Sequence, residues 1–199
     1  MNRRLKIIIY AVLIVIAIIC MACLIKIEIK RKMKEKDLLD AASNIIAKSI
    51  EPNNEERIIE QDVFSIEKLS KDKDVIGKLK IPSIDVEAPI KEGTSDDVLK
   101  EAVGHFSSTC YWNGNICLAS HNRGTYAHYF QKLDKLREGD EIVYETKLGK
   151  KIYTVSNVIE ISEYDISLLN NTNYNCLTLI TCIKNKPDKR LCVRAIENR

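Results

Sequence analysis

The sequence predicts a mainly β domain, closed or nearly closed as a barrel, which follows an N-terminal membrane helix and a helical stalk. Three observations lead to this prediction. Residues 7–25 form an apolar run of 19 residues without a charge. Residues 26–74 begin with apolar side chains at helical spacing. From residue 75 onward, seven or eight short runs rich in β-branched residues alternate with turns, as in small barrels.

The composition is that of one globular domain with an appendage. The chain has 199 residues, of which 45% are hydrophobic and 30% charged. The first 25 residues hold three of the 31 basic residues and none of the 28 acidic ones, so the remainder is balanced. A balanced chain has no basic surface for nucleic acid, and we expect no nucleic-acid partner.

The apolar run at residues 7–25 is long enough to span a membrane, which takes about 20 residues. The basic leader at residues 1–6 resembles the start of a secretory signal. However, no small-x-small cleavage pattern precedes the polar region. We therefore expect an uncleaved anchor rather than a removed signal or a buried core helix.

Residues 26–74 are expected to form a helical stalk or linker that packs against the following domain. Leu38, Ala42 and Ile45 repeat at helical spacing, and Pro52 ends the pattern. The basic residues between 26 and 36 suit a position near anionic lipid headgroups.

Residues 75–199 contain the predicted barrel. Pro82 and Pro89 mark strand edges or bends, and Ser95 is a candidate N-cap of a short helix. A buried strand, "GNICLAS", ends at His121, and a short helical turn is expected in "HYFQKLDKL". The later strands are "EIVYET", "KIYTVSNVIEI", "CLTLITC" and "RLCVRAIE".

The chain has seven cysteines. Cys20 and Cys23 lie inside the apolar run, where a redox or zinc role is not expected. The other five show no zinc-ligand spacing and cannot all pair with one another; they are Cys110, Cys117, Cys176, Cys182 and Cys192. A free thiol outside a membrane indicates a reducing habitat or a thiol kept for chemistry.

Cys182 is the candidate nucleophile, because it ends an apolar strand and a polar turn follows it. A nucleophilic thiolate needs a base or a positive charge nearby. A hairpin would return Arg190 beside Cys182, and His121 ends another strand. Taken singly, the cysteine could be a buried structural thiol and the arginine a solvated one. His105 and His128 are interpreted as surface or loop histidines.

The order of these residues resembles the sortases, the cysteine transpeptidases of Gram-positive cell walls. Five blocks agree in order over roughly residues 75–197: "VIGKLKIPSIDVEAPI", "EAVGHF" with "GNICLASH", "FQKLDKLREGDEIVY", "LTLITC" and "RLCVRA". The motif Thr-Leu-x-Thr-Cys alone is moderately specific, and the five blocks together are strongly specific.

The resemblance implies an eight-stranded sortase barrel and a set of site residues. It assigns Cys182 as the nucleophile, His121 as the acid and base, and Arg190 as the group that stabilises substrate and oxyanion. It places Thr181 and Ala119 at the substrate site. The short hairpin favours a class D-like enzyme, with class A close behind.

The implied reaction cleaves an LPxTG-like sorting signal between Thr and Gly and passes the protein, through a thioester, to a cell-wall precursor amine of the lipid II type. No cofactor is required. Some sortases bind calcium through the loop before the histidine strand, but residues 107–114 hold no acidic residue, so we expect no metal site. Asp96, Asp97 and Glu101 suit the start of a short helix instead.

The resemblance also implies a single-pass membrane protein with its N-terminus in the cytoplasm and its catalytic domain outside. Counting basic residues on the two flanks of the anchor favours the reverse, since three precede it and six follow it. Three other functions stay open at this point: a membrane-anchored cysteine peptidase that uses water, a peptide-binding barrel without catalysis, and a thiol-redox protein.

Overall fold

The computed structural model describes residues 3–49, 75–124 and 126–198. Helix α1 (Arg3–Ser49) is continuous across the predicted boundary between anchor and stalk, because it contains neither Pro nor Gly. Its segment Ile9–Ala47 is long and apolar enough to cross a membrane, and none of its most apolar part is buried. Residues 50–74, the remainder of the predicted stalk or linker, lie outside the described residues.

The chain divides into two compact units, Met1–Asp37 and Leu38–Arg199. The end of α1 therefore belongs to the same unit as the barrel. Leu38 and Ala42, one helical turn apart, are buried against Val75. The prediction that the stalk helix packs on the domain is confirmed for this last part of α1.

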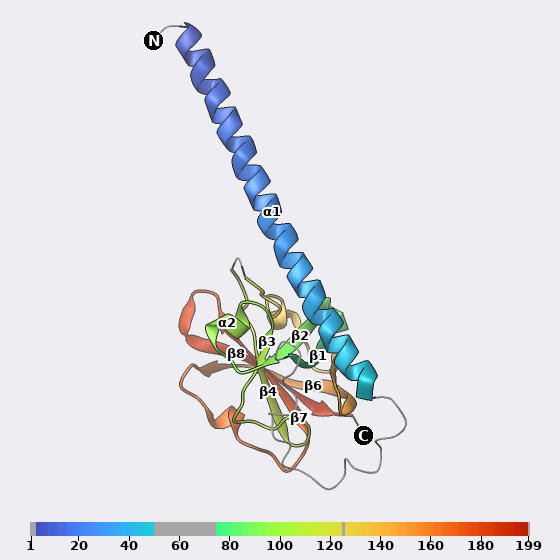
Figure 1. Cartoon of the computed structure of the whole chain (residues 1–199). Helices are drawn as coiled ribbons and strands as arrows, with labels where there is room; N and C mark the ends of the chain where they lie inside the picture. Colours follow the sequence, from blue (N-terminus) through green and yellow to red (C-terminus); the bar gives the residue numbers. More distant parts are fainter. Residues whose placement is uncertain (1–2, 50–74, 125, 199) are drawn as a thin grey trace. The chain divides into compact units, whose positions relative to one another are not determined.

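Eight strands form a closed barrel, as predicted (Figure 1). Their order around the barrel is β1-β2-β3-β4-β7-β8-β6-β5, and β5 pairs with β1 to close it. The strands are β1 (Val75–Ile81), β2 (Val86–Glu92), β3 (Val103–His105), β4 (Asn115–Ala119), β5 (Glu141–Thr146), β6 (Gly149–Ser162), β7 (Cys176–Ile183) and β8 (Lys186–Glu197).

Short helices connect some of the strands, and Figure 1 shows α2 beside β3. Ser95 precedes α2 with an extended backbone, as expected for an N-cap residue, although its side chain makes no capping hydrogen bond. The short helices are α2 (Asp96–Leu99), η3 (Pro82–Ile84), η4 (Leu133–Lys135) and η5 (Ser167–Leu169).

Alternate side chains of each strand fill the barrel. Leu118, Leu179 and Val193 come from three neighbouring strands and are fully buried. Tyr144 and Tyr153 are the largest buried side chains. Burial of one large apolar side chain contributes about 1.5–3 kcal/mol, so this interior makes a rigid support for the strand ends.

The strands that carry the candidate site residues lie side by side. β4 pairs with β7 in parallel, and β7 pairs with β8 in antiparallel. The β7–β8 hairpin turns at Asn185, which has a left-handed backbone (φ 62°) that asparagine tolerates. The pairing then jumps from Ile183–Lys186 to Cys182–Arg190. Residues 187–189 therefore form a bulge on β8.

Candidate active site

Cys182 and Arg190 face each other on β7 and β8, and His121 lies in the loop two residues after the end of the neighbouring β4. Arg190 is the direct partner of Cys182 in the β7–β8 ladder. The last β4–β7 pair is Ala119 with Ile180, and the Ser120 amide still donates to the Ile180 carbonyl at 3.4 Å. In this parallel register, the position two residues beyond Ala119 lies beside the position two residues beyond Ile180, so His121 neighbours Cys182. The structure therefore brings together the three residues that the sequence singled out.

The Cys182–Arg190 pair lies on the outer face of the barrel. Leu179 points into the core, and Cys182 follows it by three residues, which places the two on opposite faces of β7. Cys182 is exposed, whereas Cys117, Cys176 and Cys192 are buried. An exposed thiol at the end of a rigid strand is accessible to a peptide.

Asn122 ties the histidine loop to the nucleophile strand. Its side-chain amide donates a hydrogen bond to the backbone carbonyl of Cys182. The Phe130 amide donates to the His121 carbonyl at 3.2 Å, so hydrogen bonds hold both His121 and the residue that follows it. The sequence analysis did not single out Asn122, although it directly follows His121.

The Arg190 guanidinium binds three oxygen acceptors. Nη2 lies 2.7 Å from Oε2 of Glu163, the residue that follows β6. Nη1 donates to the carbonyls of Pro187 and Lys189, at 2.7 and 2.8 Å. The guanidinium is therefore fixed by the bulge of β8 and by the start of the β6–β7 connection.

The β6–β7 connection, residues 163–175, is fastened to the outer face of β4 and β8 through the Leu168 carbonyl. This oxygen accepts hydrogen bonds from Asn115 Nδ2 at 2.7 Å, Arg194 Nη2 at 3.2 Å and the Cys117 thiol at 3.8 Å. The Asn115 amide also donates to the Asn170 carbonyl at 2.9 Å. These contacts hold the connection against the outer face of β4 and β8.

The buried thiols have structural surroundings. The Cys176 thiol donates to Asn115 Oδ1 at 3.3 Å. The Thr178 hydroxyl donates to the same oxygen at 2.8 Å. Burial raises the pKa of Cys117 to about 12 and that of Cys192 to about 11. Both thiols therefore stay protonated at neutral pH. Cys192 follows Arg190 by two residues on β8 and so lies on the same face, but a fractional exposure of 0% keeps its thiol from reagents.

The two predicted substrate residues occupy different faces. Ala119 is partly exposed and pairs with Ile180, on the same face of the sheet as Cys182. Thr181 is 4% exposed and its hydroxyl donates to the Ser120 carbonyl at 2.7 Å. Because it adjoins Cys182 in a strand, its side chain lies on the inner face, and its place at the substrate site stays a prediction.

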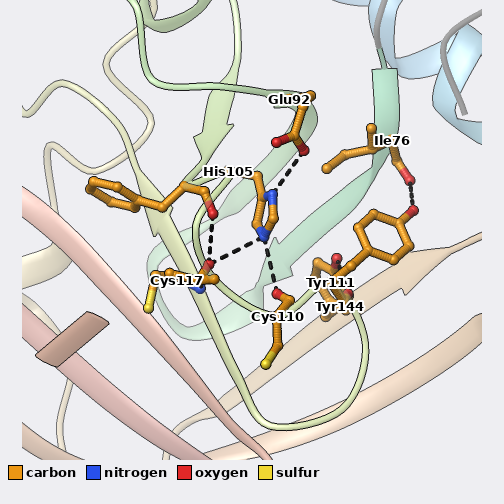
Figure 2. A network of polar contacts seen from close by, with 9 residues as sticks. Ile76, Glu92, His105, Cys110, Tyr111, Cys117 and Tyr144 are labelled. Carbon is orange, nitrogen blue, oxygen red and sulfur yellow. Dashed lines mark hydrogen bonds and ion pairs between the residues drawn. The ribbon is translucent and has the colours of Figure 1, made fainter. Parts of the chain in front are cut away.

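His105 corrects the interpretation of it as a surface or loop histidine. It belongs to β3 and is 1% exposed. Figure 2 shows its ring between Glu92 and the backbone of Cys110. Nδ1 lies 2.8 Å from Glu92 Oε2, and Nε2 lies 3.0 Å from the Cys110 carbonyl. Because β3 has only three residues, its alternation cannot be recognised in the sequence.

Burial opposes ionisation of the Glu92 carboxyl. Hydrogen bonds from His105 and Ser107, with the positive charge of His105, outweigh this effect and hold the pKa of Glu92 below its ordinary value. The pair therefore acts as a buried, hydrogen-bonded anchor for the loop before β4.

Aromatic hydroxyls fix the same loop (Figure 2). Tyr111 donates to the Ile76 carbonyl at 2.8 Å, and Tyr144 donates to the Tyr111 carbonyl at 2.9 Å. Burial raises the pKa of Tyr111 well above its ordinary value, so its hydroxyl stays a donor. The loop leads into β4 and so sets the position of His121.

His128 lies away from the Cys182–Arg190 pair. Its Nδ1–H donates to the Tyr126 carbonyl at 2.7 Å, within the loop that follows β4. Among the residues that the structure describes, no group of three or more His, Cys, Asp or Glu side chains could hold a metal ion.

Comparisons with known proteins agree with this geometry. The family model described as "Sortase domain" matches residues 79–198. Sortase A of Bacillus anthracis is 28% identical over 141 residues, covering 70% of this chain and 67% of that protein. Sortase A of Listeria monocytogenes is 33% identical over 57% of this chain, which spans about half (52%) of that relative.

Solved sortase structures share the fold. A sortase D5 transpeptidase of Clostridium perfringens superimposes with a TM-score of 0.67 at 28% identity, over 84% of this chain and 99% of that one. A sortase C of the same species, solved with the C-terminal cell wall sorting motif, gives 0.59 at 30% identity, over 63% and 71%. With its closed barrel and its Cys182–Arg190 pair beside His121, the chain belongs to the sortase family of cysteine transpeptidases.

Proposed function

We propose that this chain is a membrane-anchored sortase that cleaves an LPxTG-like sorting signal and joins the protein to a cell-wall amine. The observation that carries the proposal is the pairing of Cys182 with Arg190 on β7 and β8, beside the end of β4 that leads to His121. A nucleophile, an acid-base group and a permanent cation within one site are what acyl transfer from a peptide requires.

In the first half-reaction, the Cys182 thiolate attacks the carbonyl carbon of the Thr–Gly peptide bond. A carbon–sulfur bond forms, and the carbonyl oxygen becomes an oxyanion that the Arg190 guanidinium stabilises through its N–H groups. The imidazolium of His121 then gives its proton to the glycine nitrogen. The carbon–nitrogen bond breaks, and the threonine remains on sulfur as a thioester.

In the second half-reaction, a primary amine attacks the thioester carbon. Neutral His121 takes a proton from the attacking nitrogen, and the Cys182 thiolate leaves. The lipid II-type amine of a cell-wall precursor is the proposed acceptor. Water in its place would make the enzyme a cysteine peptidase, and the first half-reaction would be the same.

The peptide is proposed to lie on the outer face, next to Cys182 and Arg190. Ala119 and Ile180 are partly exposed there and provide an apolar floor. The sortase C neighbour solved with its sorting motif supports a peptide of this kind as the substrate. A class D-like specificity is supported by the likeness to the sortase D5 structure.

The proposed topology has the N-terminus in the cytoplasm and the barrel outside, anchored by α1. The apolar segment Ile9–Ala47 supports a membrane span. Protease added to intact cells should digest the barrel. If digestion occurred only after cell lysis, the proposed orientation would be wrong.

The test of function uses the full chain in detergent micelles with an LPxTG peptide and triglycine. The expected products are the Thr–triglycine ligation product and the free glycine peptide, identified by mass spectrometry. Cys182→Ala should abolish both, whereas Cys110→Ala should retain them. Hydrolysis without ligation would favour the peptidase, and unchanged processing by Cys182→Ala would refute both enzymatic readings.

A further inference from the structure

We propose that Glu163 is a positioning residue, which orients the Arg190 guanidinium for oxyanion stabilisation. The inference rests on the proposed acyl transfer and deepens it. Glu163 follows the last residue of β6, far from Cys182 in sequence. It contacts Arg190 and not the nucleophile in the contacts that the structure gives it, so it acts through the arginine.

The contacts divide the guanidinium into an occupied side and an available one. A guanidinium has five N–H donors. Both N–H groups of Nη1 point to carbonyls, those of Pro187 and Lys189, and one N–H of Nη2 points to Glu163. None of the contacts given for the described residues involves the Nε–H, so this donor and the second N–H of Nη2 are the groups proposed to meet the oxyanion.

Glu163 is itself fastened to the bulge. Its backbone amide donates to the Asp188 carbonyl at 2.9 Å, between the two bulge carbonyls that bind Nη1. Its carboxylate can therefore hold only one edge of the guanidinium. The bulge and the carboxylate together fix the plane of the arginine head.

The pair works through orientation rather than stability. The side chains of Arg190 and Glu163 are 27% and 28% exposed, and exposed ion pairs add little to the free energy of folding. Yet the arginine side chain has four rotatable bonds, and its backbone already faces Cys182 across the ladder. Fixing the head before the reaction avoids reorganisation when the oxyanion forms.

Glu160, two residues before the last residue of β6, provides the control for this proposal. Glu160 is also a carboxylate on β6 and also pairs with the hairpin, through both oxygens to Lys186 Nζ at 2.8 Å. It differs from Glu163 because its partner is not Arg190. Glu160→Ala therefore removes an ion pair from the same hairpin and leaves the guanidinium bound.

The experiment measures kcat and KM for peptide ligation by the full chain in micelles. We expect Glu163→Ala to lower kcat at least about tenfold, because a misplaced group loses its transition-state contact. KM should change less than about twofold, since the ground-state peptide does not need the oxyanion contact. Glu163→Gln keeps an oxygen acceptor for Nη2 and should recover most of kcat, and Glu160→Ala should resemble the unmodified chain.

A double-mutant cycle and a spectrum complete the test. In an Arg190→Lys background, Glu163→Ala should have no further effect on kcat. The Nη–H signals of Arg190 in a ¹⁵N spectrum should be slow to exchange because carbonyl and carboxylate oxygens bind them, and of the two glutamate variants only Glu163→Ala should lose the Nη2 signal. This spectrum tests the orientation of the Arg190 guanidinium without requiring catalytic activity. An inactive chain would therefore refute the proposed function but not the role of Glu163. Equal kcat values for Glu163→Ala and Glu160→Ala, a rise in kcat, or an unchanged Arg190 signal would overturn the proposal.

Discussion

Cys182 and Arg190 are direct partners across the β7–β8 ladder, on the outside of a barrel whose inside is apolar. Residues that face each other in this way have Cβ atoms about 4.5–5.5 Å apart. The exposed thiol and the arginine are therefore brought together by strand pairing itself. The groups that complete the site reach it from loops, and several of them can be tested separately.

Asn122→Ala should slow catalysis without unfolding the chain. The side-chain amide of Asn122 holds the His121 loop to the Cys182 carbonyl, so its loss frees the acid-base group from the nucleophile. We expect kcat/KM to fall about tenfold, measured by peptide ligation. Arg123→Ala, at the exposed next position, is the control. If the two variants behaved alike, Asn122 would have no part in positioning His121.

Asn115→Ala should loosen the β6–β7 connection. This buried amide donates to the Leu168 and Asn170 carbonyls and accepts from Thr178. Leaving such groups without partners costs about 3 kcal/mol of unfolding free energy, measured with urea and Trp112 fluorescence. Thr178→Val removes one contact and should cost about 1 kcal/mol. A larger loss in Thr178→Val than in Asn115→Ala would contradict this account.

Iodoacetamide at pH 8 should modify Cys182 well before Cys192 or Cys117. Cys182 is exposed, whereas burial raises the pKa of the other two thiols to about 11 and about 12. At pH 8 a thiol with a pKa of 11 is thiolate in about one molecule per thousand. Peptide mass mapping before and after denaturation gives the order. Modification of Cys192 as early as that of Cys182 would contradict the burial of the Cys192 thiol.

Glu92→Gln should destabilise the chain at pH 7 by about 2 kcal/mol, since a charged hydrogen bond to His105 is lost. The pKa of Glu92 is lowered in the folded chain, so its stabilisation is present above its ordinary value of 4.5 and is lost as pH falls below it. The difference in unfolding free energy between the variant and the unmodified chain, measured in urea, should therefore shrink at acidic pH. A difference that grew on acidification would contradict this role of Glu92.

Leu38→Ala should lower the stability of the barrel by about 2–3 kcal/mol, because the end of α1 is buried against Val75. Asn44→Ala, at an exposed position on the same helix, is the control. Thermal unfolding followed by Trp112 fluorescence distinguishes them. Equal melting temperatures would mean that the end of the helix contributes nothing to the folded domain.

The sequence was sufficient for the barrel and for the pairing of Cys182 with Arg190, because both follow from local patterns; the catalytic roles of these residues stay predictions. Alternating apolar residues identify β7, and the hairpin that follows brings Arg190 opposite Cys182. The same alternation would have placed Thr181 inside the barrel, since it adjoins Cys182. His105 was misassigned because a strand of three residues has too little pattern.

Asn122 and Glu163 could not be found in this way. Each acts on a residue that is distant in the chain: Asn122 on Cys182, and Glu163 on Arg190. Such contacts depend on how loops fold back over strand ends. Local propensity and periodicity carry no information about that.

The bulge at residues 187–189 also shifts the register of β8 against β7, and so decides which side chains of β8 face outward. If the pairing of Ile183 with Lys186 continued without it, Arg190 would fall opposite Leu179. Leu179 is a core residue, so the guanidinium would be directed into the apolar interior. An insertion of odd length exchanges the two faces of a strand. Changes in the length of this hairpin should therefore be tolerated in steps of two residues far better than in steps of one.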